Sequence, residues 1–283
     1  MPPKTQAPVR AKLGNRRVTG KEQYYTPRDL ASRLVYTVKS LVPDFESRTV
    51  IEPAGGTGAF VEAAKAAGAK KVTSVDIEPK HSQVKKANFL EAELGSKNVI
   101  TISNPPFGRN NSLSIPFFNR AAKNSDVIAF IVPRSWRKWS VINRLDPNFT
   151  LIHDEDLRID YVDDSHSLIS ERNNLKTCFQ VWVRSSELRE PVKIEDRGYV
   201  EKVKPEVADV AVTVFGYSCG KVSTDFERKA NTTKIFLKLN HPKSLAALQT
   251  MDFKRFSKNT AYTEALSFQE INFLLNEKIG GNN

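Results

Sequence analysis

Cysteine is scarce in this chain of 283 residues: Cys178 and Cys219 are its only two, and they lie far apart. Two cysteines are too few for a disulfide framework or a cysteine-rich zinc site, and they suit a reducing compartment. No uninterrupted apolar run approaches the ~20 residues needed to cross a bilayer. Because no apolar stretch follows the basic N-terminus, we expect no secretory signal and a cytoplasmic location, or a nuclear one in a eukaryotic host.

Metal-ligand spacing is also lacking, so we predict no metal site. The acidic residues between Asp154 and Asp164 show no such spacing, and we interpret them as a solvated loop face. Hydrophobic residues make up 40% and charged residues 27% of the chain, as in soluble globular proteins. The length suggests one or two domains with a substantial core.

Positive charge is what the chain has in excess, with a net charge of +11. Residues 1–28 carry seven Lys or Arg against one Glu, a net +6, and residues 100–150 carry seven against two acids, a net +5. This distribution favours a polyanionic partner, although a merely soluble basic surface would explain the charge alone. We predict a flexible basic arm over residues 1–22, which either lies along phosphates or has no role.

The first ordered segment predicted is a helix. Thr26 stands before Pro27 like an N-cap before a proline at the first helical position, and an apolar stripe continues to Leu41. Thr49–Glu52 is then predicted as a strand, residues 53–58 as a glycine turn and residues 59–68 as a helix. Such a turn lets a ligand approach the backbone, although a lone glycine-rich turn could bind any nucleotide or be a turn without a ligand. Its spacing fits neither a P-loop nor the dinucleotide motif.

An acidic residue follows the next predicted strand, Lys71–Asp76. Asp76 lies 18 residues after Gly58 (76 − 58), where a carboxylate can accept hydrogen bonds from both hydroxyls of a ribose. A helix N-cap is the alternative explanation for this aspartate.

Two prolines then stiffen the chain after an apolar run, residues 99–102, that predicts a buried strand. In Asn104-Pro105-Pro106-Phe107 each proline fixes its own φ and keeps the preceding residue out of the helical region. The Asn104 amide and the Pro105 carbonyl can therefore point the same way as two acceptors, with an aromatic ring beyond. They would suit a planar ring with an exocyclic amino group, although a proline-stiffened loop is the simpler interpretation.

Two motifs together resemble a known family. Residues 51–60, Ile-Glu-Pro-Ala-Gly-Gly-Thr-Gly-Ala-Phe, precede Asn104-Pro105-Pro106-Phe107 as the cofactor motif does in S-adenosylmethionine-dependent adenine-N6 methyltransferases of DNA. The resemblance covers residues 23–184, which it implies are the catalytic domain. It implies an α/β, Rossmann-like class I methyltransferase fold, with a mostly parallel sheet and helices on both faces. It implies S-adenosylmethionine as the cofactor and a catalytic set of Asn104, Pro105, Pro106 and Phe107.

The same resemblance implies a cofactor site. In the family, a Tyr-Thr-Pro segment lies against the methionine end of the cofactor, and here Tyr25-Thr26-Pro27 takes that position. Asn88 stands where the family usually has an aspartate that accepts from the adenine amino group, so it can accept but lacks the charge. Phe89 packs either on the adenine or in the core. The implied set is Tyr25, Thr26, Pro27, Glu52, Pro53, Ala54, Gly55, Gly56, Thr57, Gly58, Phe60, Asp76, Ile77, Asn88 and Phe89.

Basic and aromatic residues alternate after the next apolar run, residues 127–132, which predicts a central parallel strand. Arg and Lys can bind phosphates and Trp can stack on an unpaired base, although a helix packed by its Trp face explains the pattern too. The candidate nucleic-acid contacts are Arg109, Arg134, Trp136, Arg137 and Lys138.

The remainder of the chain has fewer signals. Residues 178–183 predict a late strand of the same sheet, with Cys178 buried. In residues 185–283 we predict strands near 208–214 and 234–239 and a final helix opened by the capping box Ser267–Glu270. This small C-terminal extension is a candidate substrate-recognition element, although it is short for a target-recognition domain.

We therefore expect transfer of a methyl group to the N6 amino group of adenine in DNA. Three alternatives stay open. The chain could act on adenosine in ribosomal RNA or near an mRNA cap, or on a glutamine amide of a protein, which the +11 charge and Phe107 disfavour. It could also be a non-catalytic, nucleic-acid-binding partner of an active subunit, as the departure at Asn88 suggests.

Overall fold

The structure is a computed structural model of the chain. It describes residues 24–94, 98–165, 167–169, 174–227 and 229–281. The arm expected over residues 1–22 lies outside these ranges. Within them, no helix combines the length and the hydropathy that crossing a bilayer requires.

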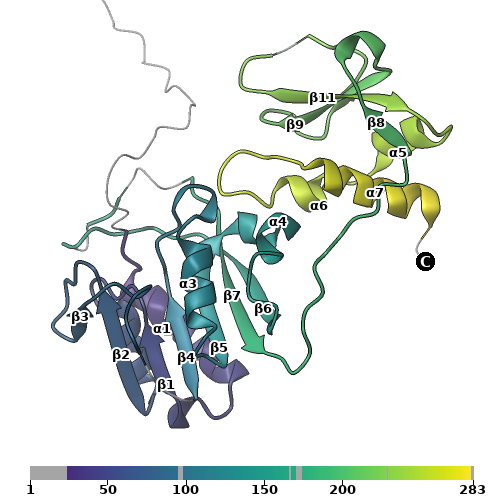
Figure 1. Ribbon diagram of the computed structural model, residues 1–283. Coiled ribbons are helices and arrows are strands. Elements are labelled where there is room, and N and C mark those ends of the chain that lie inside the picture. The colour runs from purple at the N-terminus through teal and green to yellow at the C-terminus, as the bar shows by residue number, and fades with distance from the viewer. Residues whose placement is uncertain (1–23, 95–97, 166, 170–173, 228, 282–283) are drawn as a thin grey trace, which may run out of the picture.

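A seven-stranded sheet forms the first part of the fold (Figure 1). The pairs from β3 to β5 are parallel, whereas β7 is antiparallel to both β5 and β6. In spatial order the strands are β3 (Val84–Lys86), β2 (Lys71–Asp76), β1 (Thr49–Glu52), β4 (Val99–Ser103), β5 (Val127–Pro133), β7 (Thr177–Arg184) and β6 (Phe149–Leu157). The helices of this part are α1 (Arg28–Leu41), α2 (Ala59–Ala66), α3 (Ser114–Ala121) and α4 (Trp139–Ile142), with the short 3₁₀ helices η1 (Phe45–Ser47), η2 (Arg109–Asn111) and η3 (Arg134–Arg137).

Helices cover both faces of this sheet. Successive side chains of a strand point to opposite faces. Ala129 and Ile131 of β5 belong to the core that α1 and α2 complete, while Ile128 and Phe130 belong to the core that α3 completes. Every residue of β5 is buried, as expected for a central strand. The predicted α/β, Rossmann-like fold with a mostly parallel sheet is confirmed.

The strand order reverses between β1 and β4. From β1 the chain moves outward through β2 to β3, and it then returns to β4 on the other side of β1. In open α/β sheets, ligands bind in the crevice at the carboxyl ends of the strands that flank such a reversal. Glu52 ends β1 and Asn104 directly follows β4, so two of the predicted site residues lie at this crevice.

Residues after β7 form a second, antiparallel sheet with a core of its own. Its spatial order is β10 (Val222–Ser223), β9 (Val210–Phe215), β11 (Thr233–Leu239) and β8 (Val200–Lys202). It is accompanied by α5 (Ser244–Thr250), α6 (Lys254–Ser257), α7 (Phe268–Gly280) and the 3₁₀ helix η5 (Pro205–Val207). The predicted capping box is confirmed: the Glu270 amide donates to Ser267 Oγ, and the Ser267 amide donates to the Glu270 carboxylate.

Specific side chains join the two parts. Lys138 Nζ lies 2.8 Å from the Glu270 carboxylate, and both side chains are largely buried. The Trp139 ring lies 5.2 Å from the Phe256 ring and 5.2 Å from the Phe273 ring. In Figure 1, α6 and α7 accordingly lie between the second sheet and the first.

Two local predictions are wrong. Helix α1 begins at Arg28 with Pro27 as its N-cap, and Thr26 does not cap it because its hydroxyl has another partner, described below. The acidic residues Asp154 to Asp156 lie in strand β6 and not in a solvated loop, because β6 pairs with β7 along its length.

Candidate active site

The carboxyl group of Glu52 is buried at the reversal between β1 and β4. Its Oε1 accepts hydrogen bonds from the Ala54 amide at 2.9 Å and from Ser103 Oγ at 2.5 Å. Among the described residues, its Oε2 has no hydrogen-bond partner. Burial raises the pKa of Glu52 to about 8, although the bonds from Ser103 and Ala54 oppose the rise. The second oxygen is therefore a buried polar group that a ligand can use, as a donor when the carboxyl is protonated and as an acceptor when it is ionised.

The glycine turn leaves no space for side chains. A Cβ on Gly56 would lie 2.6 Å from the Tyr25 ring, and one on Gly58 would lie 2.5 Å from the His81 ring. Both glycines also have positive φ, 44° and 81°, which residues with side chains rarely adopt. The turn therefore requires glycine at these positions, and Tyr25 and His81 lie directly against it.

The Asp76 carboxylate is part of the same turn. Its Oδ2 accepts from the Gly56 amide at 2.9 Å and its Oδ1 from the Glu78 amide at 2.8 Å. No helix follows β2 before β3 begins at Val84, so the helix N-cap interpretation of Asp76 is wrong. Ile77 beside it is exposed. Each carboxylate oxygen can accept a further bond, and the role in ribose binding stays a prediction.

Asn104 is held from the side of α1. Its Nδ2 donates to Thr26 Oγ1 at 3.2 Å across 78 residues of sequence, and Thr26 is buried. Tyr25 is fixed in turn by reciprocal backbone hydrogen bonds with Val162, of 2.9 and 3.2 Å. The Tyr-Thr-Pro segment and the Asn104 corner are therefore directly connected.

One cavity is lined by Asn104, by the Tyr25-Thr26 segment and by the glycine turn. Its volume is about 30 Å³, far below the ~300 Å³ at which small-molecule pockets begin. Part of the Tyr25 side chain is desolvated here, and this burial raises its pKa. The lining residues are Tyr24, Tyr25, Thr26, Ala54, Gly55, Thr57, Ala59, Phe60 and Asn104.

The loop after the prolines is held in an unusual backbone conformation. Gly108, Asn110 and Asn111 have φ of 66°, 54° and 62°. Asn111 is buried, and its Nδ2 donates to Ser135 Oγ at 3.2 Å. The sequence alone assigned Asn111 no role, although asparagine is enriched at left-handed backbone positions. Strain of this kind tends to gather at functional sites.

Trp136 is not a base-stacking residue, and this prediction is wrong. Its side chain is 0% exposed, and its ring packs 5.7 Å from the Phe118 ring. Its Nε1 donates to Ser114 Oγ at 3.2 Å. The alternative interpretation, in which the Trp face packs the protein interior, is the correct one.

Three of the predicted phosphate contacts are bound within the protein instead. Arg134 and Arg137 each bind Asp156, at 2.9 and 2.7 Å, and Arg137 also binds Asp154, which raises its pKa. Lys138 binds Glu270. These charges are neutralised locally, so the three residues are withdrawn as phosphate contacts. Arg109 is exposed, and its contact with nucleic acid stays a prediction.

Two predicted cofactor contacts differ in their surroundings. Phe89 is buried, with its ring 5.3 Å from that of Phe117, as its core interpretation expects, and a contact with the cofactor stays a prediction. The Asn88 Oδ1 accepts from the Leu90 amide at 3.1 Å, and its Nδ2 donates to Glu91 at 2.8 Å. An amide oxygen can accept a second bond, so the role of Asn88 stays a prediction.

Several solved structures are similar to part of this chain, whereas no protein-family model and no curated protein match it. One is a candidate RNA methyltransferase from Pyrococcus horikoshii, with 25% identity over 58% of this chain and 87% of that one, and a TM-score of 0.47. A Thermoplasma acidophilum protein has 20% identity over 59% and 92%, with a TM-score of 0.46. The modification subunit of a candidate type I restriction enzyme from Vibrio vulnificus has 14% identity over 58% and 45%, with a TM-score of 0.42.

Proposed function

We propose that the chain is an S-adenosylmethionine-dependent methyltransferase that acts on the N6 amino group of adenine in DNA. One observation carries the proposal: Asn104 and residues of the glycine turn line the same cavity. An acceptor for a planar amino group thus lies beside a turn suited to a nucleoside-like ligand. The cavity is also at the strand-order reversal, where α/β sheets bind their ligands.

Two carboxyl groups beside the cavity would suit S-adenosylmethionine. A bound cationic amino group would lower the pKa of Glu52 and keep it ionised, so that its unpartnered buried oxygen can accept a hydrogen bond from that group. Asp76 offers a carboxylate to ribose hydroxyls. Because the cavity is about 30 Å³, the Tyr25 ring over Gly56 has to move aside for a ligand of this size. When bound, the cofactor would supply a methyl group activated by its positively charged sulfur.

Asn104 is oriented to hold the acceptor amine. Because Thr26 binds its Nδ2, its Oδ1 is directed elsewhere and can accept from one N–H of the adenine N6. The Pro105 carbonyl can accept from the other N–H. These two bonds favour a tetrahedral nitrogen, whose lone pair is then free to attack the methyl carbon that the cofactor supplies. Holding the nitrogen in line with that carbon accounts for much of the rate acceleration. Neither group is a base, so the proton that N6 loses passes to water.

The residues after the two prolines would meet the DNA. Adenine in a duplex has to leave the stack before its amino group can reach this corner. Phe107 is partly buried against the core and lies beside the corner, where its ring can hold the face of the extruded base. Arg109 follows on the exposed side and can bind a flanking phosphate.

Tritiated-methyl transfer onto duplex DNA, single-stranded DNA, RNA and protein, followed by mapping of the modified group, tests the proposal. We expect N6-methyladenine in DNA. Modification of RNA alone, or of a glutamine amide, would overturn the DNA assignment. Cofactor binding without transfer to any of the four would make the chain a non-catalytic partner.

Two substitutions separate catalysis from cofactor binding. Asn104→Ala should lower transfer by roughly 100-fold or more, as losing one positioned hydrogen-bonding group does in other enzymes, while cofactor affinity stays close to wild type. Asp76→Ala should weaken the cofactor first. Asn240→Ala, at an exposed position in the second part of the chain, is the matched control and should change neither.

A further inference from the structure

We propose that the C-terminal part binds an unpaired DNA strand on an aromatic ledge formed by Phe215, Tyr217 and Tyr262. This proposal rests on the proposed function, because the strand is the one that carries the target adenine. The three side chains are 39%, 90% and 41% exposed, in that order. Exposed aromatic side chains can stack on bases, and only unpaired bases offer their own faces in return.

The turn that carries Tyr217 is firmly held. The Gly216 amide donates to the Glu264 carbonyl at 3.1 Å, and a Cβ on Gly216 would lie 2.1 Å from the Asn231 carbonyl oxygen. Gly216 has φ of 94° and Ser218 has φ of 60°. The turn between β9 and β10 is therefore fixed between two neighbouring loops, and it presents the Tyr217 ring to solvent in one place. A rigid platform loses little entropy when a base stacks on it.

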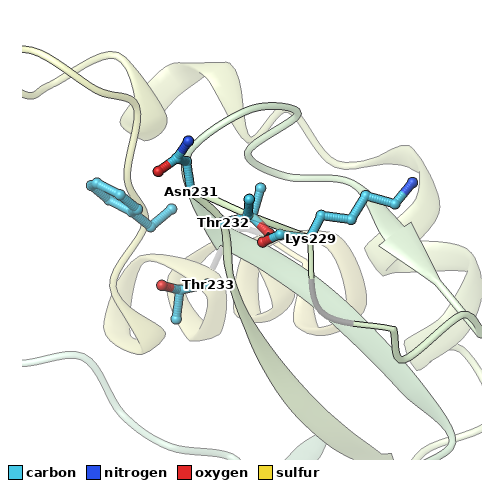
Figure 2. A pocket seen from close by; sticks show the side chains of 6 residues that line it. Lys229, Asn231, Thr232 and Thr233 are labelled. Atoms are coloured by element: carbon cyan, nitrogen blue, oxygen red, sulfur yellow. The ribbon is translucent and has the colours of Figure 1, made fainter. Parts of the chain in front are cut away.

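An open hollow lies at the surface beside Phe215. Its volume is about 410 Å³. In Figure 2 the Asn231 and Thr233 side chains lie apart from one another, and the Lys229 side chain extends away from both. Amide and hydroxyl groups can bond to base edges, and the amine can reach a phosphate. The lining residues are Phe215, Lys229, Ala230, Asn231, Thr232 and Thr233.

Positive charge gathers beside this hollow. The pKa of Asp225 is lowered first by a hydrogen bond from the Glu227 amide and then by the nearby charges of Lys234, Lys229 and Lys221. Three lysines thus lie near Asp225 and Glu227 and leave a small local positive excess. Lysines interleaved with exposed aromatic rings are the combination with which proteins bind single strands. The charge complements the phosphates of DNA.

The ledge is connected to the catalytic corner by bonded segments. Ala265 pairs with Phe215 in a β-bridge, and in the same loop the Ala261 carbonyl accepts from the Lys176 amide at 2.8 Å. The Lys176 carbonyl in turn accepts from the Arg134 amide, which follows the carboxyl end of β5. Strand β5 pairs with β4, whose end carries Asn104. The ledge and the catalytic corner thus belong to one hydrogen-bonded framework.

Binding of a fluorescent single-stranded DNA to the full chain, measured by anisotropy, tests the ledge. Tyr217→Ala should weaken binding by roughly 5- to 150-fold, the effect of losing one stacked base, and Tyr217→Phe should bind nearly as wild type because the ring is kept. Because Tyr217 is almost fully exposed, its truncation should leave the fold intact, which circular dichroism can verify. Tyr36→Ala, at an exposed tyrosine of α1, is the matched control.

A charge reversal tests the lysines independently. Lys229→Glu should weaken binding and reduce the salt slope by about one, as expected when a phosphate contact is lost. Lys65→Glu, at an exposed position of α2, should change neither. Equal salt slopes for wild type and Lys229→Glu would contradict the placement of a phosphate here.

The outcomes distinguish the ledge from the proposed function, because binding requires no methyl transfer. If Tyr217→Ala weakens binding but no adenine is methylated, the proposed function fails and the ledge stands as a binding surface. If DNA is methylated and Tyr217→Ala binds and methylates as wild type, the ledge is wrong. Tighter binding of duplex DNA or of single-stranded RNA than of single-stranded DNA also overturns it.

Discussion

Glu52→Gln removes the buried carboxyl group at the end of β1 and should make the protein more stable at high pH. The pKa of Glu52 is about 8 in the folded chain, against an ordinary value of 4.5. This difference is worth about 5 kcal/mol, because one pKa unit corresponds to about 1.4 kcal/mol. The folded chain binds the proton more tightly than the unfolded chain does. The contribution of Glu52 is therefore complete below about pH 4.5 and is lost progressively as the pH rises through 8.

Urea unfolding of wild type and Glu52→Gln at about pH 5 and about pH 9 measures this effect. Groups common to both proteins cancel in the difference. Between the two pH values, the variant should gain about 4 kcal/mol of unfolding free energy relative to wild type. Glu93→Gln, at an exposed glutamate, should show no such gain. Identical pH dependence of wild type and Glu52→Gln would refute the reasoning about the buried carboxyl.

Three further substitutions test other parts of the account. Lys138→Met leaves the buried Glu270 carboxylate unpaired and should lower the unfolding free energy by about 3–5 kcal/mol, with partial recovery in the double variant that also carries Glu270→Gln, measured by denaturant titration. Gly58→Ala places a side chain at a residue with positive φ and against the His81 ring. Calorimetry should therefore show cofactor affinity reduced roughly tenfold or more. Asn111→Gly keeps the left-handed backbone but loses the bond to Ser135, so kcat should fall roughly tenfold while KM for the cofactor changes little.

The central strands could be predicted from local sequence because burial acts along the strand itself. The predicted strands Thr49–Glu52 and Lys71–Asp76 coincide with β1 and β2. The run of residues 127–132 is apolar throughout because β5 is covered on both faces. The capping box at Ser267 is likewise a local pattern, and it too is present. The order of these elements then placed Glu52 and Asn104 at one edge of the sheet.

The wrong predictions concern side chains whose contact partners lie far away in the sequence. A run of alternating Arg and Trp does not reveal that Trp136 packs on Phe118, or that Lys138 binds a carboxylate 132 residues further on. Likewise Thr26 looks like a helix cap locally, whereas its hydroxyl accepts from Asn104, 78 residues away. Long-range pairing decides whether a polar side chain is available to a ligand, and sequence periodicity does not show it.

A crystal structure of the chain with S-adenosylmethionine tests the central claim most directly, since the claim is that the asparagine corner and the glycine turn form one methyl-transfer site. We predict the cofactor over the glycine turn, with Tyr25 displaced from Gly56 and the methyl group facing Asn104. A cofactor bound elsewhere, or bound at the turn with packed side chains between its methyl group and Asn104, would contradict the account.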